Sequence, residues 1–482
     1  MRFNRQRVAE IIEQKRETFI HVSDCIWDYA ETRFEEFRSA DLLCKTLEEE
    51  GFRVERGVGG LETAFIGSYG SGGPIIAILG EYDALSGLSQ ERGIAMHQPI
   101  QQGGNGHGCG HNLLGTGSLA AAVAVRHYME ENHIKGTVRY YGCPAEEGGS
   151  GKTIMVREGL FDDVDTAICW HPYPFNAVAA TTNLANYQVY FKFKGKAAHA
   201  SSTPHLGRSA LDAVEMMNIG ANFLREHIIP EARIHYAITN PGGFSPNVVQ
   251  AEAEVLYMVR APKAPQVEEI YQRVCKIARG AALMTETEVD IIFDKGCSNV
   301  ISNQTLLPVM YNNFRQLGVP EFDEEEKEFA RHIRTTLPES EKQSILHMLD
   351  KLQLNTDKDL VQQMKEHELS TVLLPFVNKT FNMSGSTDVG DVSWIVPTVQ
   401  CATNCFAMGT QPHTWQIVAQ GGTSIGHKGM LHAGKVMAAT AVELLLRPEV
   451  IDQAKAELQE RLDGASYVCP IPQRVKPAMS SQ

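Results

Sequence analysis

Two histidines and a cysteine stand among five glycines in the stretch from Gly103 to Asn112, which reads GGNGHGCGHN. Thiolates and neutral imidazoles are side chains that bind borderline divalent metals. Because glycine permits sharp turns, Gly110 could bring Cys109 and His111 onto one ion. The same spacing also fits a small buried cysteine without chemical function. The metal-site hypothesis therefore depends on whether other ligands reach the same place.

Four further residues of metal-binding type come directly after predicted strands: Asp83, Glu146, Glu147 and His171. The strands are predicted over residues 75–79, 137–142 and 166–170, the first of them from a continuous apolar run. Strands that alternate with helices predict a mostly parallel α/β sheet, whose ligand crevice lies beyond the carboxyl ends of the strands. Separate segments thus deliver metal-binding side chains to one edge of the sheet, which strengthens the metal-site hypothesis.

Glu146 and Glu147 are adjacent carboxylates bounded by glycines. Such a pair is commonly only surface charge. At a strand end, one carboxylate can bind a metal while its neighbour points the other way and accepts a proton from water. The run GGSGKT at residues 148–153 resembles the end of a phosphate-binding loop, but that motif requires glycine where Glu146 stands. A nucleotide site is therefore not favoured.

Residues 187–299 are predicted to form a separate, inserted domain, which we call the lid domain. Residues 187–194 alternate between apolar and polar, as in a strand with one wet face. A helix at 207–225, strands near 234–239 and 252–260, a helix at 266–283 and a strand at 288–293 complete the order βαββαβ. This order is that of a ferredoxin-like α+β unit.

The residues on either side of the lid domain, 1–186 and 300–482, are predicted to form one discontinuous catalytic domain with helices over 8–29, 39–50, 113–129 and 430–446. Residues 322–379 are charged and helix-prone, and we call them the helical segment. A strand is predicted at 405–409. His413 follows it and is a further candidate ligand.

Composition narrows the class of protein. The chain has 482 residues, 43% of them hydrophobic, and a net charge of −14. This charge argues against nucleic acid and anionic membranes as partners and favours small molecules. The N-terminus lacks the apolar core of a signal peptide, and no uncharged apolar run reaches the ~18 residues of a membrane span. The ten cysteines are scattered, so we expect a reducing cytoplasm.

These motifs resemble those of the M20 metallopeptidases, in their amidohydrolase branch. The matching elements cover almost the whole chain and are, in order, EYDAL at 81–85, HGCGHN at 107–112, PAEE at 144–147, WHP at 170–172 and GKAAHA at 195–200. The resemblance implies a zinc-peptidase-like catalytic domain, a mostly parallel sheet flanked by helices. It also implies that the inserted ferredoxin-like domain serves as a lid and dimerisation domain.

The resemblance also implies roles for individual residues. Two divalent ions, Mn or Zn, would be held by Cys109, His111, Glu147, His171 and His413. Glu146 would be the general base and acid, and His199 of the lid domain would stabilise the oxyanion, often across a dimer interface. Asn247 and Arg260, the latter on a strand expected at the exposed edge, would bind the substrate carboxylate, for which arginine offers a two-pronged donor.

Three positions have roles that the resemblance leaves open. Asn112 stands where the branch usually has Asp, and Glu81 stands where other branches place a metal-binding histidine. Asp83 is a candidate to orient a metal ligand from behind rather than to bind the metal itself.

Within the branch, the runs STDVGDVSW at 386–394 and HTW at 413–415 resemble the group that cleaves the amide joining p-aminobenzoate to glutamate, a product of folate breakdown. Metal-dependent hydrolysis of this N-acyl amino acid is the implied function. A dipeptidase, a hydrolase of other N-acyl amino acids, or a subunit that completes or regulates a partner hydrolase are alternatives. A cysteine hydrolase with Cys109 as nucleophile would leave Glu147, His171 and His413 without roles. The implied partner is a second copy through the lid domain, or a related subunit.

Overall fold

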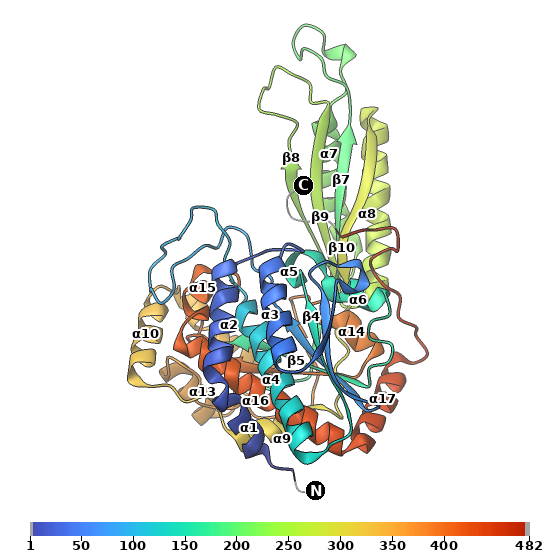
Figure 1. The fold of residues 1–482 in the computed structure, drawn as a ribbon. Helices are drawn as coiled ribbons and strands as arrows, with labels where there is room; N and C mark the ends of the chain where they lie inside the picture. The colour runs from blue at the N-terminus through green and yellow to red at the C-terminus, as the bar shows by residue number, and fades with distance from the viewer. Residues whose placement is uncertain (1–2, 478–482) are drawn as a thin grey trace.

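The computed structural model describes residues 3–477, which form an α/β domain and a smaller domain that projects from it (Figure 1). The sheet of the larger domain has six strands in the order β1-β2-β4-β3-β5-β12. Their bounds are β1 Arg53–Arg56, β2 Phe65–Ser71, β4 Gly136–Cys143, β3 Ile75–Glu81, β5 Thr166–Tyr173 and β12 Thr398–Asn404. The last four are parallel to one another. β2 runs antiparallel to both of its neighbours, β1 and β4.

The predicted α/β fold is confirmed, but the antiparallel strands β1 and β2 were not predicted. β1 has only four residues, and β2 contains two glycines and two serines, which weaken the apolar alternation of a strand. The sheet is therefore mixed, with a parallel core.

Two long helices, α4 (His111–Asn132) and α16 (Ser424–Leu446), pack against each other over one face of the sheet. Both are apolar around most of their circumference because other helices cover them in turn. These helices are α1 (Arg5–Gln14), α2 (Arg16–Tyr29) and α9 (Leu307–Leu317). The first helix, expected over 8–29, is thus divided at Lys15. α16 is long and apolar enough to cross a membrane by composition, but 83% of that stretch is buried inside the protein.

The opposite face of the sheet packs against α6 (Gly151–Arg157) and α14 (Val389–Ile395). The remaining helices of this domain are α3 (Phe37–Glu49), α5 (Glu146–Gly149), α15 (Trp415–Gly421), α17 (Pro448–Leu462) and the 3-10 turn η1 (Val58–Gly60). A two-stranded sheet joins β6 (Thr181–Asn183) to β11 (Phe381–Met383).

The lid domain has a four-stranded antiparallel sheet in the order β10-β7-β9-β8. Its elements are β7 Ala185–Lys194, η2 Pro204–Leu206, α7 Ala210–Leu224, η3 Arg225–His227, β8 Arg233–Asn240, β9 Glu252–Ala261, α8 Ala264–Thr285 and β10 Glu288–Cys297. The order βαββαβ is the one the sequence predicts. The strand that carries Arg260 was expected at the exposed edge, and this was wrong, because β9 lies between β7 and β8.

The helical segment contains α10 (Glu324–Thr335), α11 (Glu339–Lys342), α12 (Ser344–Lys351) and α13 (Lys358–Glu366). Its apolar residues form two clusters of their own, which pack against the chain around Tyr173 and around Ala407. In Figure 1, α10 and α13 lie on the side of the catalytic domain, whereas the lid domain rises from its top.

Two strand boundaries near the candidate site differ from the prediction. The strand expected at 405–409 is instead β12, which ends at Asn404, and residues 405–409 form the turn that follows it. β5 continues to Tyr173, so His171 lies within the strand rather than after it. The apolar run alone could not locate these ends, because buried strands and buried turns are equally apolar here.

Candidate active site

The five predicted metal ligands come together at the carboxyl ends of β3, β4 and β5. Their atoms form two groups, Cys109 with His111 and His171, and Cys109 with Glu147 and His413, each within 4.8 Å. Cys109 belongs to both groups, so this arrangement could hold two neighbouring ions. A third group of the same kind joins Glu81, His111 and Glu146.

Gly110 makes the approach of Cys109 and His111 possible. Its φ of +80° lies in the left-handed region, and an added Cβ would lie 2.9 Å from a ring carbon of Pro172. His111 then begins α4, and the Cys109 Sγ lies 3.4 Å from the His171 Nε2. Only glycine fits this turn without strain, which explains the predicted need for it.

Asp83 orients two of these ligands at once. Its Oδ1 accepts a hydrogen bond of 2.9 Å from His111 Nδ1, and its Oδ2 accepts one of 2.9 Å from the backbone N–H of Glu147. Because His111 Nδ1 carries the proton, its Nε2 is left with a lone pair for a metal. Asp83 thus contacts two of the candidate ligands, and its role in orienting them stays a prediction.

Glu146 and Glu147 separate because the backbone turns sharply before them. Ala145 has a φ of +55°, and the buried Glu36 accepts a 2.9 Å hydrogen bond from its N–H. Glu147 then faces His413, with Oε1 and Nε2 3.1 Å apart. Glu146 lies in the group with Glu81 and His111 instead.

The two carboxylates also differ in acidity. Burial raises the pKa of Glu146 well above its usual value, and repulsion by Glu81 and Glu147 adds to this effect. Burial also opposes ionisation of Glu147, but the facing His413 and the charge of His111 lower its pKa to about 2. Glu147 is thus an ionised ligand type, and Glu146 is a group that holds a proton readily.

The donor set fits divalent ions. The buried atoms His111 Nε2 and Glu147 Oε1 lie 3.3 Å from Glu81 Oε2 and 3.1 Å from His413 Nε2, and each points into a cluster of other ligand atoms. Burial lowers the pKa of His111, but the charges of Cys109 and Asp83 outweigh burial and raise that pKa well above its usual value. The location therefore favours positive charge, which a metal would supply. Burial lowers the pKa of His171 to about 4, so this imidazole is neutral, as a ligand must be.

A cysteine nucleophile is not supported. Burial raises the pKa of the Cys109 thiol, and the negative charge of Glu147 raises it further. The reactive thiolate is therefore disfavoured in the absence of a metal.

Glu81 has a partner that the sequence did not reveal. Lys152, fully buried, places its Nζ 2.7 Å from Glu81 and 2.6 Å from Asp388. The backbone N–H of Lys152 also donates to Asp388 at 2.8 Å. Lys152 belongs to the GGSGKT run that resembled a phosphate loop, and its charge is neutralised by carboxylates instead. Glu36 has no sequence signal, and the motifs that contain Lys152 and Asp388 did not reveal their pairing, because the partners lie far away in the chain.

His413 reaches the site from a loop held against the glycine-rich stretch. Its φ is +61°, and its N–H donates a 2.7 Å hydrogen bond to the carbonyl of Gly108. Its side chain is half exposed, and the facing Glu147 raises its pKa.

The predicted residues of the lid domain are not in contact with this group. His199 and Asn247 are exposed, and no hydrogen bond or ion pair joins either side chain to the five ligands in the part of the chain that the structure describes. Arg260 is half-buried and donates from Nη1 to Ser386 Oγ at 2.8 Å. Asn112 binds Ser23 Oγ and the carbonyl of Gly421, so it supports the fold behind the site.

Comparison with known proteins decides the family. Residues 77–298 match the model of peptidase family M20/M25/M40. The chain is 53% identical over 471 residues to the B subunit of p-aminobenzoyl-glutamate hydrolase from Escherichia coli, covering 98% of both chains. The chain belongs to peptidase family M20/M25/M40. As an M20 protein with this donor set, it is a metal-dependent amidohydrolase.

Other M20 proteins are more distant. The chain is 29% identical to Xaa-Arg dipeptidase of Mus musculus, covering 95% of this chain and 93% of the relative. It is 26% identical to the A subunit of p-aminobenzoyl-glutamate hydrolase from Escherichia coli, over 53% of this chain and 69% of the relative. A dinuclear metal-binding M20 peptidase of Bacillus subtilis has the same fold, with a TM-score of 0.54 at 17% identity, covering 90% of this chain and 99% of that one.

We expect Asp83→Asn to weaken metal binding about 10- to 100-fold, because both His111 and Glu147 lose the group that orients them. Titration of the metal-free protein with Mn or Zn, followed by calorimetry, measures this change. Asp163→Asn is the matched control, since Asp163 is exposed and pairs with Arg139 near the surface. Equal affinities for both variants would contradict the role of Asp83.

Proposed function

We propose that this M20 protein hydrolyses the amide bond of an N-acyl amino acid, with p-aminobenzoyl-glutamate as its substrate. The observation that carries this proposal is the proton-holding Glu146 beside five converging metal ligands. The substrate is inferred from the relative at 53% identity, whose name specifies it.

Divalent ions bound by Cys109, His111, Glu147, His171 and His413 would act as Lewis acids toward a carbonyl oxygen and a water molecule. In its ionised form Glu146 would take a proton from that water, and in its protonated form it would give this proton to the leaving amine. A carboxyl group with a raised pKa is suited to both transfers near neutral pH.

His199 is prepared to donate a hydrogen bond to the oxyanion. Its Nδ1 accepts from the backbone N–H groups of Ser201 and Ser202, at 3.3 and 3.2 Å. The proton of the neutral ring therefore resides on Nε2, which is free to point at a developing negative charge. Closure of the lid domain, or a partner's lid domain, would bring it to the substrate.

The substrate carboxylate is assigned to Arg260 and Asn247. Arg260 uses one guanidinium nitrogen for Ser386, which fixes the side chain and leaves further donors for a carboxylate. A dipeptide or another acyl amino acid presents the same carboxylate, and the 29% identity to Xaa-Arg dipeptidase supports testing such substrates.

We expect the purified, metal-loaded protein to hydrolyse p-aminobenzoyl-glutamate faster than Xaa-Arg dipeptides or acetyl-alanine, and a chelator to abolish the activity. Return of Mn or of Zn to the same sample then identifies the metal by recovered turnover. Preferential cleavage of dipeptides would show that the substrate assignment is wrong.

Glu146→Gln should retain the bound metal but lower kcat at least about 100-fold, because proton transfer is lost while the ligands remain. Glu147→Gln is the matched control, since it removes a ligand and should lower the metal content itself. Metal analysis and steady-state kinetics on both variants separate the two roles. An active Glu146→Gln enzyme would refute the assignment of the base.

We further propose that the lid domain associates with the lid domain of a related M20 chain, in the cytoplasm. On α7, Met216, Ile219 and Phe223 are exposed at helical spacing, and Phe223 is 73% exposed. The adjacent edge strand β8 pairs only with β9 among the described strands, and its Ile238 is exposed. An unpaired edge beside an apolar helix face suits a second such domain. Two relatives are named as different subunits of one hydrolase, which supports this partner, and the ten free cysteines fit a reducing compartment.

Phe223→Lys should reduce association, because it places a charge in the proposed interface. Light scattering at micromolar concentration measures the molar mass of the chain in two samples. In one the chain is alone, and in the other it is co-expressed with the A subunit of p-aminobenzoyl-glutamate hydrolase, the relative at 26% identity. Leu283→Lys is the control, since Leu283 is 81% exposed on the other helix of the same domain. Self-association of the wild type would identify a second copy as the partner, and a monomer in both samples would refute the interface.

A further inference from the structure

A row of aromatic rings leads away from the candidate metal ligands. Alternate residues of a strand face the same side, as His171 and Tyr173 do at the end of β5, and Phe175 follows in the bend beyond the strand. The ring centres of His171 and Tyr173 are 4.8 Å apart, and those of Tyr173 and Phe175 are 5.0 Å apart. The row is thus continuous with the site, starting at one of its ligands.

Tyr173 differs from the tyrosines packed in the interior. The hydroxyls of Tyr82, Tyr140 and Tyr141 each donate to a backbone carbonyl. The Tyr173 hydroxyl forms no hydrogen bond with any residue that the structure describes, although the phenol lies beside Cys109. Tyr173 is only partly buried and its hydroxyl is not enclosed, so this hydroxyl is open to a ligand.

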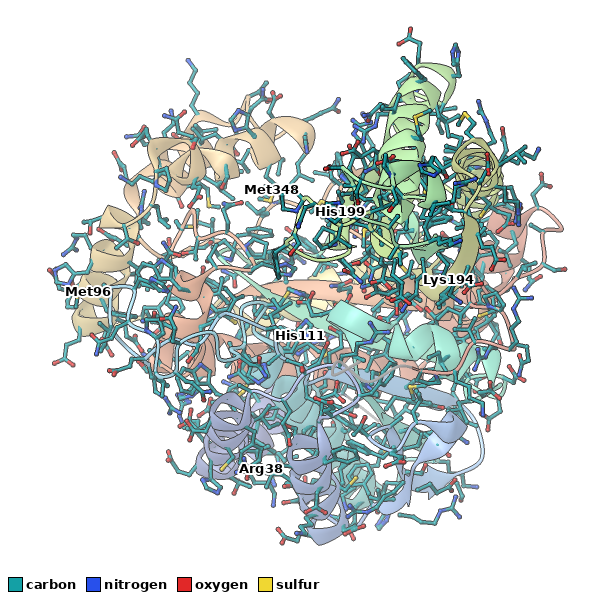
Figure 2. The ribbon with its side chains drawn as sticks, turned by 90° about the horizontal axis from the view of Figure 1, so that it is seen from above. Arg38, Met96, His111, Lys194, His199 and Met348 are labelled. Carbon is teal, nitrogen blue, oxygen red and sulfur yellow. The ribbon has the colours of Figure 1, made fainter. Side chains whose placement is uncertain are left out.

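The helical segment meets the same row from the other side. Leu346 and Met348 of α12 pack against the apolar cluster that also contacts Tyr173 and Phe175. Met348 is half-buried, so part of its side chain is available. Seen from above, Met348 lies on the side of the helical segment and His199 on the side of the lid domain (Figure 2).

The start of α12 is fixed to the loop that carries His413. Gln411 Nε2 donates to Ser344 Oγ at 2.8 Å. Gly409 packs so closely against Lys342 that an added Cβ would lie 3.0 Å from the Lys342 Cα. The helical segment is therefore attached both to the aromatic row and to the loop of a metal ligand. It forms a wall of the site rather than a remote appendage.

We propose that Tyr173, Phe175 and Met348 line the subsite for the acyl group, and that this subsite selects an aromatic acyl group. This inference rests on the proposed function, since it places the acyl side of the same substrate. Aromatic rings favour edge-to-face or offset contact with another ring, and a methionine sulfur adds a favourable contact at a ring edge. The Tyr173 hydroxyl is available for a polar substituent of the acyl ring. A small aliphatic acyl group would leave most of these contacts unused.

The test compares the two product halves as inhibitors of p-aminobenzoyl-glutamate hydrolysis, in wild type and in the variants Tyr173→Leu and Met348→Ala. We expect the inhibition constant of p-aminobenzoate to rise about 10-fold in each variant, and that of glutamate to change less than about 2-fold. KM for the substrate should rise more than kcat falls. Tyr173→Phe keeps the ring and should bind p-aminobenzoate more tightly than Tyr173→Leu.

Phe329→Leu is the matched control within the helical segment, because Phe329 packs against the separate cluster around Ala330 and Ile333. Metal content, measured on every variant, identifies any damage to the neighbouring His171. Unchanged inhibition by p-aminobenzoate, or an equal loss of both inhibitors, would overturn the subsite while leaving the hydrolase intact. A wild-type protein that cleaves dipeptides but no acyl-glutamate would overturn the proposed function, and the subsite with it.

Discussion

A concentration of negative charge at one end of the central sheet governs how the surrounding residues are arranged. Glu81, Asp83 and Asp388 are almost fully buried there, beside Glu146 and Glu147. Burying carboxylates without partners is very unfavourable. One fully buried cation, Lys152, lies between Glu81 and Asp388 and neutralises part of this charge. The negative charge that Lys152 does not neutralise surrounds the histidines and Cys109, where divalent ions would balance it.

This charge balance explains why the residues behind the ligands are as important as the ligands. Asp83 spans His111 and Glu147, and Glu36 fixes the backbone from which Glu146 and Glu147 diverge. Neighbouring carboxylates therefore acquire opposite acidities, one ionised and one holding a proton. Their surroundings thus make Glu147 suited to bind a metal and Glu146 suited to transfer a proton, although the two side chains are chemically identical.

The lid domain is joined to the site at its base. The backbone carbonyl of Glu147 accepts a hydrogen bond from Lys295 of β10, and Arg33 pairs with the neighbouring Asp294 at 2.7 Å. The apolar core is also continuous, because buried residues of the central sheet and of the lid domain belong to one cluster. The exposed loops with His199 and Asn247 therefore project from a base that is attached to the site. The helical segment is attached to the His413 loop through Ser344 and Lys342.

Local patterns were enough to predict the types of element and the ligands that lie close together in the chain. Cys109 and His111 are recognisable because glycine and metal-binding residues stand together, and the βαββαβ order follows from local periodicity. The strand ends at Asn404 and Tyr173 were missed, since apolar side chains continue into the turns beyond them. The short antiparallel strands β1 and β2 carry too few apolar residues to be predicted. The family, the candidate metal ligands and the order of elements can be predicted from the sequence, because they follow from residue types at local spacings.

Only the folded chain establishes which distant charges meet. Lys152 is local in sequence to Glu147, yet its partners Glu81 and Asp388 are 71 residues before it and 236 residues after it. Likewise, Met348 comes to pack against the same apolar cluster as Tyr173 and Phe175 through folding alone. The ion pairs between distant residues depend on burial and distance, which local spacing in the sequence does not encode. The same holds for the pKa of Glu146 and for the residues that surround the site.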